Sequence, residues 1–186
     1  FRIYDLDMPE FPLCIDKYGD YIHVSEYKRN HTLDDLQYDE WLYQSIEIIS
    51  TVTAITKENI FVKERKIIQT RTDQYTKTNE SKNEVVVIEN GYKFFVNFQD
   101  YIDTGLFLDH RITRKMVGDI SNDKKVLNLF AYTGSFSVYA AMNGAEEVQT
   151  IDLSNTYIQW AKRNFEVNNL DASHYTFSAA DVMKTL

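Results

Sequence analysis

The sequence feature that most constrains the fold is the run Val126–Phe136, which reads VLNLFAYTGSF. Its apolar first part is too short and too sharply bounded for a helix, so it predicts a buried strand. Residues 133–135 are turn formers, and the apolar residues after them predict a helix that ends near Asn143. A second strand, 148–151, runs directly into Asp152. This order predicts half of a nucleotide-binding α/β sheet, with the ligand at the carboxyl ends of the strands.

The spacing between the turn and the acid, together with the glycine content of the turn, narrows the range of candidate ligands. Asp152 follows Gly134 by 18 residues, close to the roughly 20 that place an acid on a ribose hydroxyl. A dinucleotide needs glycines at G-x-G-x-x-G spacing, whereas this loop has one glycine and carries bulky Phe130 and Tyr132. S-adenosylmethionine contains adenosine without a phosphate, so the loop favours it. The alternative is an ordinary β-α-β unit in which Asp152 merely caps the helix that starts near Ser154.

Charge and cysteine content exclude some classes of protein. The net charge of −8 argues against tight, sequence-independent binding to nucleic acid by this chain. No apolar stretch is long enough to span a membrane, and no signal peptide opens the chain, so no membrane partner is expected. The single Cys14 cannot form an internal disulfide and fits a reducing compartment, which predicts a cytoplasmic location. The start without Met suggests a piece of a longer protein.

The first hundred residues predict a small α+β domain, 1–100, ahead of a second domain, 101–186. Thr32 and Asp35 have capping-box spacing at the start of the helix, and Asn90-Gly91 is a strong hairpin signal. The expected order is strand, strand, helix, strand, hairpin, at residues 13–16, 21–27, 33–52, 59–64 and 85–98. The polar stretch 63–81 is either a solvated loop or an RNA-facing basic loop with Tyr75 available to stack on a base.

The segment after the domain boundary carries charges near a predicted helix start. Asp109 is a candidate cap for a helix whose inner face would hold Ile112, Met116 and Val117. Arg111 and Arg114 fall near the first turn, where positive charge does not suit the helix dipole. Arg111 therefore either meets a ligand carboxylate or acidic partner, or forms a surface salt bridge. No metal-ligand spacing surrounds His110, so no metal site is expected.

The last segment predicts a further helix and strand. Ser154 can cap a helix that ends near Asn168-Asn169, and residues 174–178 predict a third strand that leads to Asp181. Asp181 is placed either to accept a hydrogen bond from an adenine amino group or to cap a helix. No Ser-His-Asp set, Cys-His pair or catalytic carboxylate pair is visible.

Several motifs together resemble one family. They are DYIDTGLFLDHR at 100–111, NLFAYTGS at 128–135, DLS at 152–154 and WAKRN at 160–164. The chain resembles the RlmI/RlmK-type class I methyltransferases of 23S rRNA, and most closely the RlmK half of the bifunctional RlmKL enzymes, known for guanine-N7 methylation. The resemblance covers essentially the whole chain, including RIYDLDMPE at 2–10.

The resemblance implies a truncated Rossmann-like class I methyltransferase core preceded by a small α+β domain. It implies that S-adenosyl-L-methionine is the cofactor and that 23S rRNA or a pre-ribosomal particle is the partner. The implied cofactor-binding residues are Phe107, Asp109, Arg111, Asn128, Phe130, Ala131, Tyr132, Thr133, Gly134, Ser135, Phe136, Asp152, Leu153, Ser154 and Asp181. The family's Asp-Pro-Pro motif, which lines the acceptor pocket, would lie beyond Leu186, so the catalytic residues are not in this sequence and the chain alone should be inactive.

Two other functions remain as alternatives. One is a fragment of an NAD-type dinucleotide-binding oxidoreductase, and the other is a non-catalytic RNA-binding module. In the methyltransferase topology a strand after Asp181 would pair beside 126–130. Without that strand, 126–130 would form an exposed apolar edge, which predicts self-association.

Overall fold

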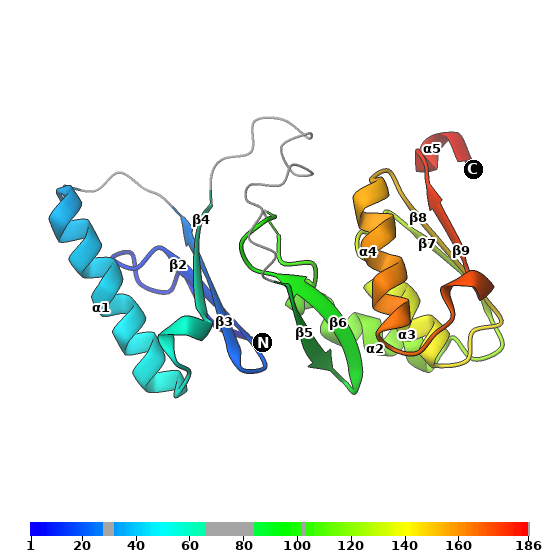
Figure 1. Ribbon diagram of the computed structural model, residues 1–186, viewed down its shortest axis with the longest axis horizontal. Coiled ribbons are helices and arrows are strands. Elements are labelled where there is room, and N and C mark those ends of the chain that lie inside the picture. Colours follow the sequence, from blue (N-terminus) through cyan, green and yellow to red (C-terminus); the bar gives the residue numbers. More distant parts are fainter. Residues whose placement is uncertain (28–31, 66–83, 102, 186) are drawn as a thin grey trace. The chain divides into compact units, whose positions relative to one another are not determined.

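The computed structural model describes residues 1–27, 32–65, 84–101 and 103–185, and it divides into two compact units (Figure 1). The first unit is Phe1–Arg71 and the second is Thr72–Leu186. This division differs from the boundary expected near residue 100, because the hairpin that precedes that point packs within the second unit. Most of the polar stretch 63–81, including Tyr75, lies outside the described residues. Among the described helices, none is both long and apolar enough to cross a membrane.

The first unit is a four-stranded sheet with one long helix. Its strands are β1 (Arg2–Asp5), β2 (Leu13–Tyr18), β3 (Tyr21–Tyr27) and β4 (Ile60–Arg65). They lie in the order β1-β2-β3-β4, in which only the β3–β4 pair is parallel. The crossover between that pair is α1 (Asp35–Thr53), followed by the short 3₁₀ turn η1 (Lys57–Asn59). The predicted hairpin, helix and strand are present, and β1 is an additional strand.

The start of α1 corrects the predicted cap. Asp34, rather than Thr32, is the N-cap: its carboxylate accepts from the backbone N–H of Gln37 at 2.9 Å. The Gln37 side-chain oxygen in turn accepts from the N–H of Asp34 at 3.1 Å. A carboxylate suits the positive end of a helix, and the longer Gln side chain reaches back where Asp35 would not. The capping box is therefore two residues further along the chain than its predicted position.

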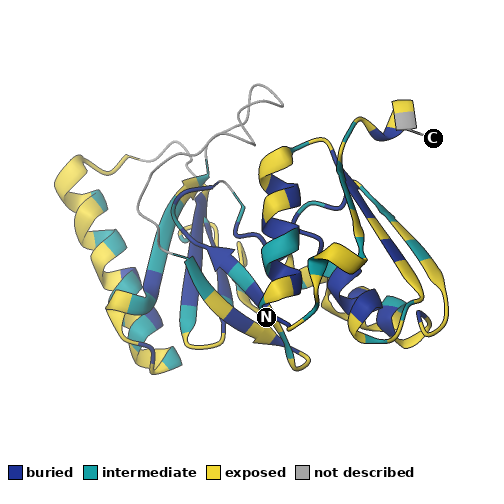
Figure 2. Ribbon diagram, turned by 45° about the vertical axis from the view of Figure 1, so that its right-hand side comes forward, coloured by how far each residue is buried: buried dark blue, intermediate teal, exposed yellow. Residues whose placement is uncertain are grey.

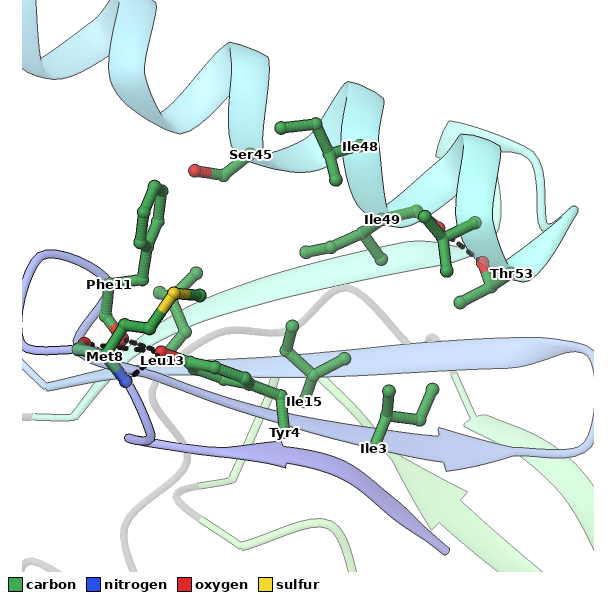
Figure 3. Close-up of a pocket in the computed structure, with 11 residues that line it drawn as sticks. Ile3, Tyr4, Met8, Phe11, Leu13, Ile15, Ser45, Ile48, Ile49 and Thr53 are labelled. Atoms are coloured by element: carbon green, nitrogen blue, oxygen red, sulfur yellow. Dashed lines mark hydrogen bonds between the residues drawn. The ribbon is translucent and has the colours of Figure 1, made fainter.

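The core of the first unit lies between α1 and the sheet. Ile22, Val24 and Ile49 are buried there with other aliphatic residues. Beside this core, α1 and the β1–β2 region enclose an apolar pocket of about 260 Å³ (Figure 3). Its walls include Ile15 and Ile48, and its only polar side-chain atoms come from hydroxyls and a thioether. Figure 2 shows that the outer face of α1 is exposed.

The second unit begins with the hairpin of β5 (Glu84–Glu89) and β6 (Tyr92–Asn97). Asn90 and Gly91 both have positive φ, 51° and 87°, as a tight two-residue hairpin turn requires. This part of the sequence prediction is confirmed. The other elements are η3 (Leu108–His110), α2 (Arg111–Asp119), β7 (Lys125–Leu129), α3 (Ser135–Met142), β8 (Glu147–Asp152), α4 (Asn155–Glu166), η4 (Ala172–His174), β9 (Thr176–Ala179) and α5 (Val182–Thr185).

Three layers make up the second unit. Strands β7, β8 and β9 form a parallel sheet in that order, as predicted from the alternation of strands and helices. Helices α3 and α4 contact this sheet on one side and β6 on the other, so they lie between the sheet and the hairpin (Figure 1). Within the part of the chain that the structure describes, β7 has a strand partner on one edge only.

Two buried asparagines, one on α4 and one just after its C-terminus, attach the hairpin to the helices. Asn164 accepts from the backbone N–H of Phe95 at 2.9 Å, and Asn168 both accepts from and donates to the backbone of Lys93. The indole N–H of Trp160 donates to the carbonyl of Phe95 at 3.0 Å. These side chains satisfy backbone groups of β6 that the two-stranded hairpin leaves unpaired. They explain why the hairpin belongs to the second unit.

The orientation of α2 corrects another expectation. Asp109 does not cap this helix; it lies in the preceding 3₁₀ turn, and the N-cap is His110 without a side-chain hydrogen bond. Of the expected inner residues, Ile112 and Met116 are exposed and Val117 is half-buried, whereas Arg114 is buried. The apolar periodicity predicted the wrong face, because the residue that points inward is Arg114, which forms an ion pair with the buried Glu89.

Candidate functional site

The candidate site lies at the carboxyl edge of the parallel sheet. The register pairs Leu129 with Ile151 and Asp152 with Ala179, so the three strands end at the same level. The loops that follow β7, β8 and β9 therefore emerge side by side. Ligands of open α/β sheets bind outside this edge, as the sequence predicted here.

The loop after β7 has an unusual backbone. Phe130, Tyr132 and Gly134 all have positive φ, at 54°, 52° and 70°. Positive φ is uncommon for bulky residues, and such strain concentrates at functional sites. The loop is nevertheless well fixed, because Ala131 donates to the carbonyl of Ile151 at 3.0 Å and Gly134 donates to that of Ala131 at 2.9 Å.

Asp152 connects this loop with the one after β8. Its Oδ2 accepts from the backbone N–H of Tyr132 at 2.8 Å, and its Oδ1 accepts from that of Ser154 at 2.9 Å. The residue is only 8% exposed. Each carboxylate oxygen has more than one acceptor position, so both can also accept from a ligand hydroxyl. The carboxylate is thus held in place between two loops with acceptor capacity for a vicinal diol such as a ribose.

Thr133 and Gly134 hold the loop against its neighbours. The Thr133 hydroxyl donates to the carbonyl of Gly105 at 2.5 Å, and Asn164 donates to the carbonyl of Thr133 at 2.9 Å. A Cβ on Gly134 would lie 2.7 Å from the Cβ of Ala161. A glycine is therefore needed at position 134 for the fold itself, because φ is positive there and the residue packs closely against α4.

Asn128 has a role in the framework. Its amide donates to the hydroxyl of Ser137 at 2.9 Å, and the hydroxyl of Thr150 donates to the same oxygen at 2.8 Å. Ser137 and Thr150 are fully buried. This chain of hydrogen bonds connects β7, α3 and β8 beneath the loop.

The TGLFLDHR stretch meets the same loop through aromatic rings. The ring of Phe107 lies 5.2 Å from that of Tyr132, and the ring of His110 lies 5.9 Å from that of Phe136. Asp109 and Arg111 are exposed beside this contact. The structure therefore brings Phe107 and Phe136 to the site region, and it leaves Asp109 and Arg111 at the surface.

The remaining predicted residues are arranged around the edge. Ser154 is the N-cap of α4, as predicted, and accepts from the N–H of Tyr157 at 3.4 Å. Leu153 and Asp181 are exposed, Ala131 is buried, and Ser135 is half-buried at the start of α3. Asp181 accepts from the N–H of Met183 at 3.0 Å, which is the capping contact that the sequence left open. The contact leaves Asp181 with acceptor capacity for a ligand.

Sequence reasoning assigned no role to two residues that shape the site. Asn164 holds the carbonyl of Thr133, and the ring of Tyr157 lies edge-on to that of Tyr132 at 4.5 Å. Asn164 left a signal in the sequence: it is a polar residue on the predicted inner face of α4, between Ala161 and Phe165. Such a residue is expected to be hydrogen-bonded inside the fold.

Comparison with known proteins decides the family. A family model described as S-adenosylmethionine-dependent methyltransferase matches residues 30–186. The chain belongs to this family. S-adenosylmethionine is therefore its cofactor, and the dinucleotide alternative is not favoured. The fixed Asp152 carboxylate suits the ribose of that cofactor. The turn at Gly134 lacks the glycine spacing that a pyrophosphate needs, which suits a cofactor without phosphate.

Similar proteins support the resemblance found in the motifs. Ribosomal RNA large subunit methyltransferase K of Neisseria meningitidis serogroup B is 48% identical over 186 residues, which are all of this chain and 52% of the relative. Methyltransferase K/L of Shewanella sediminis is 46% identical over 99% of this chain and 26% of its own length. The chain thus spans about half of the first relative's length and about a quarter of the second's.

A solved structure confirms the fold class. SMU.776, a protein assigned as a methyltransferase and crystallised with SAH, aligns with a TM-score of 0.73 at 28% identity. The alignment covers all of this chain and 46% of that one. The Rossmann-like α/β core with a small α+β unit before it is confirmed.

Proposed function

We propose that the intact protein methylates 23S rRNA and that the edge around Asp152 holds the adenosyl group of the cofactor. The observation that carries the proposal is the Asp152 carboxylate, fixed by the N–H groups of Tyr132 and Ser154 beside the Gly134 turn. The relatives of this chain are named as large-subunit rRNA methyltransferases, which supports the RNA substrate.

The residues around this edge have the following proposed roles in binding the cofactor. Asp152 binds the ribose, Asp181 meets the adenine amino group, and the loop 130–136 packs against the adenosyl moiety. Phe107, Asp109 and Arg111 flank the methionine end, where the exposed Arg111 can pair with a carboxylate. When bound, S-adenosylmethionine supplies an electrophilic methyl group on its sulfonium.

The finer proposal is that the acceptor is guanine N7. This atom carries a lone pair and no proton, so the protein needs no strong general base and acts mainly by aligning the reactants. We further propose that the 186-residue chain alone transfers no methyl group, which is supported by its spanning about half and about a quarter of the relatives' length. Mapping of modified nucleotides by mass spectrometry, in rRNA treated with the intact protein, tests the acceptor atom.

The test of the cofactor site is Asp152→Ala in the intact protein. Loss of two ribose hydrogen bonds to a charged acceptor should weaken binding of S-adenosylhomocysteine by at least about tenfold in calorimetry. Asp171→Ala is the matched control, because Asp171 is an exposed acid that caps η4. Unchanged affinity of the Asp152 variant would remove its role, and binding of NAD in place of the adenosyl ligand would overturn the proposal.

We also propose that the isolated chain self-associates through β7, whose outer edge has no partner among the described residues and whose Leu127 is exposed. Light scattering provides the test, and a monomer at all concentrations would contradict it.

A further inference from the structure

The second unit, which holds the proposed cofactor site, also has a pocket formed by the start of β5, Tyr101 and one face of α4. Its volume is about 380 Å³, which is large enough for a small planar ligand. The residues that matter for its chemistry are Glu84, Asn155, Gln159, Trp160 and Arg163. None of them belongs to the cofactor site proposed above.

Arg163 is the most organised group in this pocket. Its Nη1 donates to Oε1 of Glu84 at 3.0 Å and its Nη2 donates to Oε2, so the carboxylate holds both arms of the guanidinium. The guanidinium carbon also lies 4.4 Å from the ring centroid of Phe95. Two contacts of different kinds therefore fix the guanidinium, while the Arg163 side chain remains 41% exposed.

The charge of the pocket selects the ligand. Glu84 neutralises Arg163, so the pocket does not offer the free positive charge that a phosphate needs. A fixed guanidinium plane is instead a surface on which an uncharged ring can stack. Asn155 and Gln159, both exposed on α4, supply amide donors and acceptors beside it. Amide side chains and a planar stacking surface together match the edge and the face of a nucleobase.

We propose that this pocket takes one unpaired nucleobase of the RNA substrate, which stacks on Arg163 and hydrogen-bonds to the amide of Gln159. The assignment rests on the proposed function, because it takes the substrate to be RNA. It places an RNA contact on α4 and the hairpin, in a pocket whose lining includes Asn155, the residue directly after the N-cap Ser154.

The test uses the intact protein and a 23S rRNA fragment that it methylates. Arg163→Lys keeps the charge but removes the plane, and Gln159→Ala removes an exposed amide whose contact within α4 is a 3.4 Å hydrogen bond to Asn155. We expect Arg163→Lys to raise the Kd for the RNA at least fivefold and Gln159→Ala to raise it at least twofold, with unchanged affinity for S-adenosylhomocysteine. Lys162→Ala is the control, because it removes a neighbouring charge on the same helix.

The outcomes separate the two proposals. If the wild-type protein methylates the RNA while both variants bind it within twofold of wild type, the pocket assignment is wrong and the proposed function stands. If Lys162→Ala weakens binding as much as Arg163→Lys, the loss is not specific to the guanidinium plane and the assignment is also wrong. If the wild type neither binds nor methylates 23S rRNA, the proposed function fails and the assignment falls with it.

Discussion

The two ends of strand β5 carry the same ion pair in opposite environments. Glu89, at one end, accepts two hydrogen bonds of 2.9 Å from Arg114 of α2. Glu84, at the other end, accepts two from Arg163 of α4. The side chains of the first pair are 1% and 6% exposed, whereas those of the second are 41% and 27% exposed.

The two pairs also differ in what surrounds them. Tyr139 donates to Oε1 of Glu89 at 2.9 Å, so the buried pair is part of a network. Burial, and then the charge of Glu89, raises the pKa of Tyr139, which keeps its hydroxyl as a donor. The network holds β5, α2 and α3 together, while the exposed pair can meet a ligand. Both pairs make two hydrogen bonds between guanidinium and carboxylate, so burial is the feature that distinguishes them.

The largest effect is expected from Arg114→Met. This change leaves the Glu89 carboxylate buried without its cation, which should lower the free energy of unfolding by about 3–5 kcal/mol. Urea unfolding of the intact protein measures it. In Arg114→Met/Glu89→Leu the orphaned charge is gone, so much of the stability should return. Equal loss in the single and double variants would show that packing, rather than charge, dominates the buried end.

A buried titratable group in the first unit extends the comparison to pH. Burial lowers the pKa of His23 from 6.5 to about 4, with a smaller opposing effect from Asp16 and smaller contributions in the same direction from Arg65 and Lys63. The unfolded chain therefore binds this proton more readily, so stability falls as the pH drops from about 6.5 towards 4, by up to about 3 kcal/mol. His23→Gln should flatten the pH dependence of unfolding in that window, and an unchanged slope would contradict it.

Gly134→Ala tests how much the close packing of the loop against α4 contributes to the free energy of unfolding. The new methyl would overlap Ala161 and would also occupy a positive-φ position, so a loss of about 1–3 kcal/mol is expected in thermal or urea unfolding. Gly91→Ala is the matched control, because Gly91 has positive φ with nothing within 4 Å of the added atom. The two losses being equal would indicate that backbone strain alone accounts for both.

The smallest effect is expected at the exposed end of β5. Arg163→Ala should lower the free energy of unfolding by at most about 1 kcal/mol, because a partly exposed ion pair gains little over its hydrated ions. Urea unfolding of Arg163→Ala and of Arg114→Met under the same conditions compares the two losses of stability directly. A loss as large as that of the buried pair would mean that Arg163 is structural and would weaken its assignment to a ligand.

The sequence was sufficient for the elements that local signals define. The Asn90-Gly91 turn gave the hairpin, and the run 126–136 with Asp152 gave the order of the parallel sheet. The face of α2 was not predictable, because the exposed Ile112 and buried Arg114 reverse the usual preference, and the reason is an acid 25 residues earlier. The attachment of the hairpin to α4 depends on asparagines far along the chain. A polar residue on an inner helix face indicates a buried hydrogen bond, but the sequence does not show which distant group is its partner.

The bracing of the loop between Ala131 and Gly134 has a thermodynamic consequence. The carbonyl of Gly105, the amide of Asn164 and the carboxylate of Asp152 form hydrogen bonds to this loop from three sides. A cofactor that reaches this surface has little backbone left to immobilise, so its entropy of association should be dominated by the cofactor's own rotors and by released water.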